Sequence, residues 1–241
     1  MLKNLASLII AAAMMTSSLA WAQNKKYQLV RIVNLAEQEV AAKMLIDIYK
    51  DAGLEVEIQP VPGDRARADA TTGSVDGETL RIFSYGEKNP TMVRVPTPYS
   101  SLETTAFALK SRNIKINTQD DLRKYRIVIV RGVQHTRDVT QGLSTVHEIN
   151  DGEQMMKFLE ADRADIAITN TITGLGILKK LKNTSIAPSG TLNTLELFHY
   201  LHEKNKDLVP KIDASIKANA KSGELKKMRD KFEKEYLDAI Q

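Results

Sequence analysis

Short runs of β-branched and aliphatic residues alternate with segments of helical periodicity along most of the chain. Residues 27–33 (YQLVRIV) predict a buried strand, and in residues 37–52 the apolar positions recur at helical spacing. Gly53 follows where such a helix would terminate. Residues 54–58 alternate as LEVEI, which predicts a second strand, and we expect residues 60–63, which begin with proline, to break it.

The same alternation continues to the C-terminus. Further strands are predicted at residues 104–109, 126–130 and 166–168, and further helices at residues 65–72, 152–161, 173–181 and along the C-terminal stretch, where Leu225, Met228, Phe232 and Tyr236 share one face. Alternating strands and helices predict an α/β fold with mostly parallel sheets. The chain shows no internal repeat and no low-complexity linker.

The N-terminal segment has the pattern of a secretory signal peptide. Lys3 precedes an apolar stretch at residues 5–15, and residues 20–22 read Ala-Trp-Ala. We expect cleavage after Ala22 and a mature protein in the periplasm; the alternative is a retained membrane anchor. We expect no membrane insertion after cleavage, because no later segment has the roughly 18 apolar residues of a span.

Composition narrows the classes of partner. Residues 1–22 contain one of the 34 Lys and Arg residues, so 33 remain against 30 Asp and Glu, a net charge of +3. This weak charge, with 5% aromatic residues, argues against nucleic acid as a partner. The chain has no cysteine, which excludes a cysteine-linked lipid anchor and disulfides. About 219 mature residues suit one large domain or two lobes, and we expect a monomer.

Motifs for other chemistry are weak. No phosphate-binding loop, dinucleotide fingerprint or serine nucleophile elbow is present, so we expect no cofactor and no catalytic residues. His199 and His202 have a spacing that could serve a metal, but no clear third ligand accompanies them. We therefore expect no metal site, and we expect these histidines on a peripheral helix.

Several sequence fragments occur in one specific order. They are Asp64-Arg65-Ala66-Arg67 with Gly73-Ser74-Val75-Asp76-Gly77-Glu78 and Arg81-Ile82, then Val95-Pro96-Thr97-Pro98-Tyr99, then Asp121-Leu122 with residues 125–132, and then residues 159–165 (LEADRAD). In this order the chain, from Tyr27 to Tyr236, resembles the bacterial extracellular solute-binding proteins of family 3. That family serves ABC-type uptake of polar amino acids.

The resemblance implies a fold of the periplasmic-binding-protein type II, with two α/β lobes. One lobe would combine residues 23–105 with residues 194–241, and residues 106–193 would form the other. Two crossovers, near residues 103–109 and 190–195, would act as the hinge. The solute would bind between the lobes, at the carboxyl ends of the strands, and the hinge would close over it.

In the first lobe, four side chains are candidates for contact with the solute. Arg65 is predicted to precede or open a short helix and could hold a carboxylate or phosphate through two hydrogen bonds. Glu78 and Arg81 are predicted just after a strand, although they could instead pair with each other. Tyr99 lies near the lobe junction, where the family often places an aromatic residue over its ligand; a buried core tyrosine is the alternative.

In the second lobe, the segment from Arg131 to Thr136 ends a predicted strand and opens a helix. The resemblance implies that this loop presents donors to a ligand carboxylate. Gly132 would allow close approach of the backbone, and the side chains of Gln134, His135 and Thr136 could donate hydrogen bonds. A solvent-facing loop histidine is the alternative for His135.

Asn170 and Thr171 end the predicted strand of residues 166–168 and are the last two candidate ligand-binding residues. The family commonly has an acidic residue near this point to hold the ligand ammonium, and this chain has none there. The family's arginine before the crossover is also not clearly matched, since residues 85–90 read YGEKNP. These departures argue against an ordinary α-amino acid and leave open an organic anion, a modified amino acid or another small polar solute.

Three functions follow from the resemblance. The first is a receptor that delivers a small polar or anionic solute to an ABC permease. The second is a sensory or orphan binding protein that signals to a membrane partner through its closed state. The third is an enzyme like the cyclohexadienyl dehydratases, for which Glu78 or His135 would be the acid–base group. Nothing in the spacing supports catalysis, so we expect a binding protein and not an enzyme.

Overall fold

The structure is a computed structural model that describes residues 25–241. The predicted signal peptide, with its cleavage point after Ala22, lies outside the described residues. Among the described residues, no helix combines the length and the apolar character that a membrane span needs.

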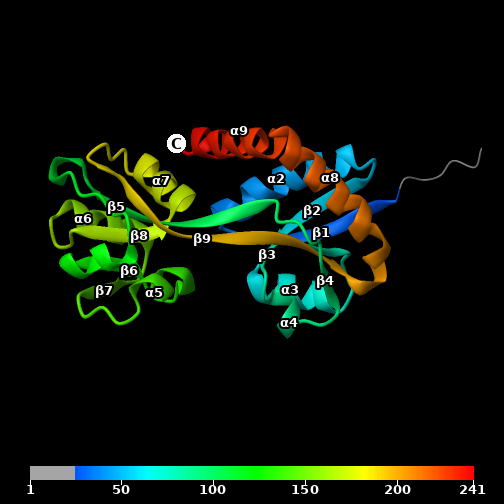
Figure 1. Cartoon of the computed structure of the whole chain (residues 1–241), viewed down its shortest axis with the longest axis horizontal. Coiled ribbons are helices and arrows are strands. Elements are labelled where there is room, and N and C mark those ends of the chain that lie inside the picture. The colour runs from blue at the N-terminus through cyan, green and yellow to red at the C-terminus, as the bar shows by residue number, and fades with distance from the viewer. Residues whose placement is uncertain (1–24) are drawn as a thin grey trace, which may run out of the picture.

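Two lobes make up the described chain, and two long strands pass between them (Figure 1). The first lobe holds β1 (Lys26–Ile32), α2 (Ala36–Asp51), β2 (Glu55–Val61), α3 (Gly63–Thr71), β3 (Gly77–Ile82), α4 (Tyr85–Lys88), β4 (Met92–Arg94), α8 (Val209–Ser222) and α9 (Glu224–Ala239). The second lobe holds β6 (Ile127–Val130), α5 (Gln134–Thr140), β7 (Val146–Ile149), α6 (Gly152–Glu160), β8 (Ile166–Asn170) and α7 (Thr171–Lys180). The connecting strands are β5 (Ser100–Leu109) and β9 (Ile186–His202), and short 3-10 helices span Lys110–Arg112, Gln119–Lys124 and Glu203–Leu208.

One sheet runs through both lobes in the order β2-β1-β3-β9-β5-β8-β6-β7, with β4 added beside β9. Four strand pairs of the described chain are parallel, β1 with β2 and β3, and β6 with β7 and β8. β3 and β4 are antiparallel to β9, and β8 is antiparallel to β5, so the sheet is mixed. β5 and β9 are antiparallel to each other from the Ser100–Leu197 pair to the Leu109–Ile186 pair. The predicted α/β class, with two lobes and two crossovers, is confirmed.

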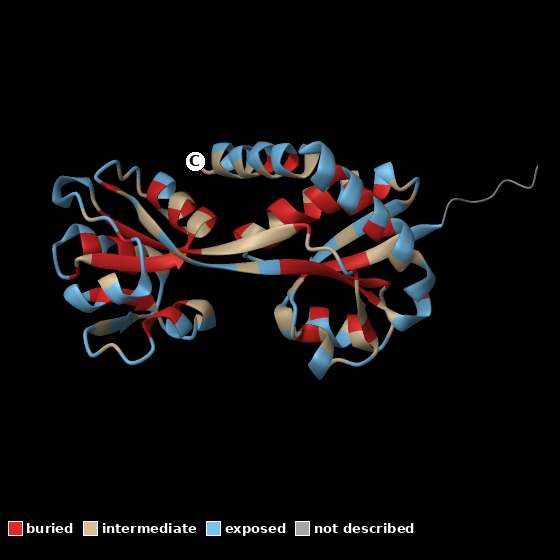
Figure 2. Ribbon diagram, in the orientation of Figure 1, coloured by how far each residue is buried: buried red, intermediate tan, exposed pale blue. Residues whose placement is uncertain are grey.

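Each lobe has its own apolar core (Figure 2). In the first lobe, the buried face of α2 packs against the sheet and against α8 and α9, with Met44, Leu45 and Ile48 fully buried. The cores of the second lobe contain only residues between Ala106 and Leu192. The predicted boundaries at residues 105/106 and 193/194 fall inside the connecting strands β5 and β9. Where one lobe ends and the other begins along these strands stays a prediction.

Several element boundaries differ from the prediction. β2 continues through Pro60 to Val61, because β2 is an edge strand, where the missing N–H of a proline costs no sheet hydrogen bond. Glu78 and Arg81 lie within β3 and not after a strand end. The C-terminal helical stretch is divided into α8 and α9 by Gly223, whose φ of 77° favours glycine.

The prediction that His199 and His202 lie on a peripheral helix is wrong. Both belong to β9, where alternate residues point to opposite faces of the sheet. His199 is fully buried; its ring nitrogens lie 2.8 Å from the Tyr49 hydroxyl and 2.8 Å from the Glu78 carbonyl oxygen. Burial lowers the pKa of His199 to about 4, as expected for a neutral core histidine.

Candidate functional site

A cavity of about 320 Å³ lies at the carboxyl end of β3, next to the two connecting strands. We call it the inner cavity. It is lined by Glu37, Gln38, Leu80, Arg81, Ile82, Ser84, Tyr85, Lys88, Leu102 and Leu197. Leu102 lies on β5 and Leu197 on β9, so the inner cavity sits where the first lobe meets the strands that lead to the second. This is the position at which open α/β sheets bind ligands.

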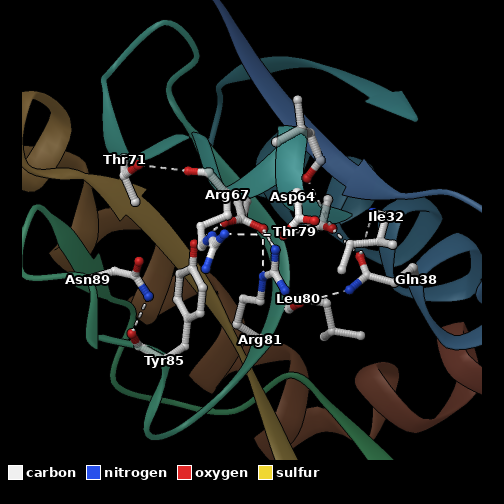
Figure 3. A network of polar contacts seen from close by, with 12 residues as sticks. Ile32, Gln38, Asp64, Arg67, Thr71, Thr79, Leu80, Arg81, Tyr85 and Asn89 are labelled. Atoms are coloured by element: carbon white, nitrogen blue, oxygen red, sulfur yellow. Dashed lines mark hydrogen bonds and ion pairs between the residues drawn. The ribbon is translucent and has the colours of Figure 1, made fainter. Parts of the chain in front are cut away.

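The start of α2 is fixed to the sheet by Gln38, which is 5% exposed. Its side-chain Nε2 donates to the Leu80 carbonyl at 2.8 Å, and its Oε1 accepts from the Thr79 hydroxyl at 2.9 Å (Figure 3). The Ile32 amide also donates to this oxygen, at 3.4 Å. Gln38 therefore has its polar atoms engaged, and its role in the wall of the cavity is to hold α2 against β1 and β3.

Glu78, Arg81 and Tyr85 contact one another at the inner cavity, which Arg81 and Tyr85 line and Glu78 does not. The Glu78 side chain is 2% exposed, and its Oε2 accepts from Arg81 Nε at 2.6 Å. The Tyr85 hydroxyl donates to the other carboxylate oxygen, and the Arg81 guanidinium stacks on the Tyr85 ring at 4.6 Å from its centre (Figure 3). Burial and the Glu78 carboxylate raise the pKa of Tyr85. Glu78 thus holds Arg81 in one orientation at the edge of the cavity.

Two further charged side chains line the inner cavity, one from α4 and one from α2. Lys88, at the end of α4, is exposed and forms no ion pair with any residue from 25 to 241. Glu37 is half-buried in the first turn of α2, and burial raises the pKa of its carboxyl, an effect partly offset by a hydrogen bond with its own backbone. Of the two cations that line the inner cavity, Arg81 is already balanced by Glu78, so Lys88 is the one that the described residues leave without an ion pair.

A second, more open cavity of about 700 Å³ adjoins the first, and we call it the outer cavity. It shares Ile82 and Ser84 with the inner cavity and adds Phe83, Asp138, Thr194, Leu195, Glu196 and Phe198. Asp138 comes from α5, so the outer cavity has walls from both lobes. Ile82 is 47% exposed and Phe83 is 54% exposed, so large apolar side chains form part of the rim of the outer cavity.

Two of the predicted first-lobe residues lie away from both cavities. Arg65 is within α3, its side chain is 69% exposed, and its Nε donates to Asp69 at 3.2 Å. Tyr99 is 1% exposed in the core of the first lobe, where its hydroxyl donates to the Thr79 carbonyl at 2.8 Å. Of the four candidates in this lobe, only Glu78 and Arg81 come together, and Arg81 alone lines the inner cavity.

The second-lobe loop begins with Arg131 and Gly132. Arg131 is 62% exposed and its Nε donates to Glu148 at 3.3 Å. Gly132 is exposed and has a φ of 85°, a conformation that favours glycine. Neither residue lines the inner or the outer cavity.

The same loop ends at the start of α5. The Thr136 hydroxyl donates to the Val133 carbonyl at 2.9 Å and Thr136 is 1% exposed, so its hydroxyl is engaged by the backbone at the start of its own helix and does not reach the cavities. His135 Nδ1 lies 2.9 Å from the Thr104 hydroxyl on β5, and burial lowers the pKa of this histidine. His135 thus contacts the connecting strand and forms part of the junction between the lobes.

Asn170 and Thr171 lie at the carboxyl end of β8 and face the first lobe. Asn170 Nδ2 donates to Glu37 Oε2 at 3.3 Å, a hydrogen bond between the two lobes. The Thr171 hydroxyl lies 2.6 Å from that of Thr105. A small cavity of about 30 Å³, which we call the cross-lobe cavity, lies here and is lined by Glu37, Val40, Ser100, Ser101, Glu103, Asn170, Ile172, Arg229 and Glu233.

Of the residues that line the inner cavity, only Arg81 was predicted from the sequence, and the polar residues that were missed are Glu37, Gln38, Ser84, Tyr85 and Lys88. Glu37 and Gln38 could have been found, because they open the helix that follows the first strand, and such loops face the cleft in α/β folds. Tyr85 and Lys88 lie in the stretch that stands where the family has an arginine. Their short helix α4 has no periodicity long enough to predict which side chains face inward.

Comparisons with known proteins place this geometry in a fold. No protein-family model matches the chain. The chain is 26% identical over 194 residues to an uncharacterized protein of Shewanella oneidensis, a match that covers 77% of this chain and 73% of that protein. The L-cystine solute receptor of Neisseria gonorrhoeae, in its unliganded open conformation, superposes with a TM-score of 0.72 at 16% identity, over 87% of this chain and 93% of the receptor.

A second solved structure broadens the comparison. It is a histidine kinase sensor domain with similarity to periplasmic binding proteins, and it superposes with a TM-score of 0.61 at 15% identity, over 87% of this chain and 96% of the domain. At these identities the comparisons show the fold, which is the two-lobed periplasmic-binding-protein fold. Membership of solute-binding family 3 stays a prediction from the sequence fragments.

Proposed function

We propose that this protein binds a small polar or anionic solute between its two lobes, outside the cytoplasm, and passes its closed state to a membrane partner. The observation that carries the proposal is the inner cavity, where Lys88 and Arg81 face a space next to the hinge strands. Lys88 is free of intramolecular ion pairs in the described structure, and Arg81 is held rigidly by Glu78. A lysine that the described residues leave unpaired, beside a fixed guanidinium in one cavity, suits a carboxylate or a comparable anionic group.

The first candidate for the partner is an ABC permease that imports the solute. The Neisseria receptor of the same fold supports this choice, because its name describes a solute receptor. The second candidate is a membrane sensor, and the similarity to a histidine kinase sensor domain favours it. Binding without turnover is part of the proposal for both. Uptake of radiolabelled solute by cells with and without the gene separates the two, since loss of uptake supports the permease.

The proposal is tested by a thermal-shift screen on the chain expressed without residues 1–22, after unfolding and refolding to remove any bound solute. The library contains carboxylates, amino acids, polyamines, sugars and phosphates. A solute at 100 times its dissociation constant adds about 2.7 kcal/mol to the free energy of unfolding, which gives a clear shift in melting temperature. We expect a carboxylate-bearing hit.

A pair of lysine variants locates the hit. Lys88→Ala is expected to weaken the binding of that solute at least about tenfold, the loss expected for one charge-assisted hydrogen bond. Lys50→Ala serves as the matched control, because Lys50 is an exposed lysine at the far end of α2. Equal affinities in the two variants would remove the inner cavity from the proposal. The absence of any hit from the whole library would refute solute binding itself.

A further inference from the structure

Glu37 occupies a position that no other side chain of the site shares. It lines the inner cavity together with Arg81 and Lys88, and it also lines the cross-lobe cavity together with Asn170 and Arg229. The wall between the solute space and the contact of the two lobes therefore contains one carboxylate. Within the described part of the chain, Glu37 is thus the one side chain that lines both the inner cavity and the cross-lobe cavity.

The hydrogen bond from Asn170 to Glu37 has a fixed direction. Asn170 is 6% exposed, and its Oδ1 caps α7 by accepting from the Ile172 amide at 3.0 Å and the Thr173 amide at 3.4 Å. Because that oxygen is committed to the helix, the amide cannot turn over without losing both bonds. Its Nδ2 must then point at the Glu37 carboxylate, 3.3 Å away in the other lobe.

The surroundings of Glu37 are rich in acidic groups. The charged and titratable side chains near it are Glu103 on β5, Arg229, Glu233 and Tyr236 on α9, and Arg81 and Lys88 in the inner cavity. Burial raises the pKa of Glu37 and of Glu233, and nearby Glu103 adds to the effect on Glu233. A cation that reaches Glu37 from the inner cavity lowers the pKa of Glu37 and so favours its ionised carboxylate.

We propose that Glu37 is a specificity-determining residue that couples the solute to lobe closure: it receives a cationic group of the solute and, through Asn170, holds the second lobe against the first. This inference rests on the proposed function and adds a requirement for a positive group on the solute. A carboxylate kept ionised by that group accepts a stronger, charge-assisted hydrogen bond from Asn170. The solute thereby stabilises the closed arrangement more than the open one, as a closing ligand must.

Binding measurements test the charge of Glu37. The probes are 3-aminopropanoate, 4-aminobutanoate and 5-aminopentanoate, each compared with the same acid without the amino group. In the unaltered chain we expect the amino form to bind at least about tenfold more tightly, a preference that shrinks as the pH falls from about 7.5 to about 5. In Glu37→Gln, which keeps an acceptor for Asn170 and loses the charge, we expect no preference at either pH.

The matched control is Glu39→Gln, two residues further along α2 and therefore on a different face of the helix, where the Glu39 side chain is 42% exposed and lines neither the inner nor the cross-lobe cavity. It should retain the preference for the amino form. If Glu37→Gln and Glu39→Gln behave alike, or if the unaltered chain shows no preference in any pair, the inference is wrong. The proposed function would survive that result provided that a solute from the screen still binds in a Lys88-dependent way.

A distance measurement tests the link to closure. The chain contains no cysteine, so Lys50→Cys on α2 and Lys157→Cys on α6 place one spin label on each lobe at exposed positions. Double electron–electron resonance then reports the distance between lobes, with 4-aminobutanoate and butanoate as probes. We expect 4-aminobutanoate to narrow the distribution towards the shorter distance, and Asn170→Ala to abolish this change. Identical distributions with and without Asn170→Ala would overturn the coupling.

Discussion

The pair of Arg81 and Glu78 makes an asymmetric prediction about stability. The Glu78 side chain is 2% exposed, whereas that of Arg81 is 18% exposed at the edge of the inner cavity. Arg81→Ala leaves a buried carboxylate whose remaining side-chain partner among the described residues is the Tyr85 hydroxyl. Glu78→Gln leaves a guanidinium that can turn into the cavity and contact water. Removal of the cation should therefore destabilise the fold more than neutralisation of the anion.

The magnitudes follow from burial. Removing one partner of a buried ion pair costs about 3–5 kcal/mol, and we place Arg81→Ala near the lower end, at about 3 kcal/mol, because water in the adjoining cavity can partly solvate Glu78. For Glu78→Gln we expect about 1–2 kcal/mol, since the amide still accepts one hydrogen bond. The double variant leaves no unpaired charge, so it should be no less stable than Arg81→Ala alone. The two changes are thus strongly non-additive.

Urea unfolding followed by far-ultraviolet circular dichroism measures all four proteins of this double-mutant cycle. Circular dichroism is the suitable signal, because the only tryptophan of the chain is Trp21, in the predicted signal peptide. Equal losses for Arg81→Ala and Glu78→Gln, or losses that simply add in the double variant, would refute the reasoning. The expected loss also explains why Lys88 and not Arg81 is the residue to change when binding is tested.

Two other predictions concern residues outside the cavities. Tyr99→Phe loses a hydrogen bond to a backbone carbonyl, so it should lower the free energy of unfolding by about 1 kcal/mol and leave solute affinity unchanged. A clear loss of affinity with unchanged stability would instead place Tyr99 in the site. Hydrogen bonds from Arg126 hold the pKa of Asp165 down to about 2. The ionised Asp165 therefore stabilises the fold above about pH 4, and this effect is lost as the pH falls through about 2. In the same urea assay, Asp165→Asn should be less stable than the unaltered chain at neutral pH and equally stable near pH 2.

Much of the fold was predictable because strands and helices of the core have strong periodic patterns. The helix at 36–51 and the strand at 26–32 agree with their predictions within one residue, and Gly53, with a φ of 63°, ends the helix as expected. Pro60 was wrongly predicted to end its strand, because proline is excluded from central strands but tolerated in edge strands. Which strand lies at the edge depends on the tertiary fold and cannot be read from the local sequence. The histidines of β9 misled it for a similar reason, since their spacing fits a helix as well as a strand.

The site was harder to predict than the fold, because the availability of a charged side chain depends on its partners. Arg65, Arg81 and Arg131 all looked available for a ligand, yet each pairs with a nearby carboxylate. Two of these pairs join residues three or four positions apart. The pair of Arg81 with Glu78 was the alternative stated from the sequence and is confirmed, and the pair of Arg65 with Asp69 could have been anticipated in the same way. The bond between Glu37 and Asn170 joins residues 133 positions apart, and no local pattern indicates it.

The contacts between the lobes also indicate how the cleft opens. On the side of α2, α7 and α9 the lobes are already joined, by the Asn170–Glu37 hydrogen bond and by an ion pair between Lys179 and Asp238 at 3.5 Å. On the side of α5, Asp138 faces the exposed Ile82 and Phe83 across the outer cavity. In this structure the joined side is held, while the outer cavity on the other side is open and adjoins the inner cavity, so the outer cavity offers the way in. We therefore expect the solute to enter past Phe83, and Glu37, at the closed end of the cleft, to be the last group that it meets.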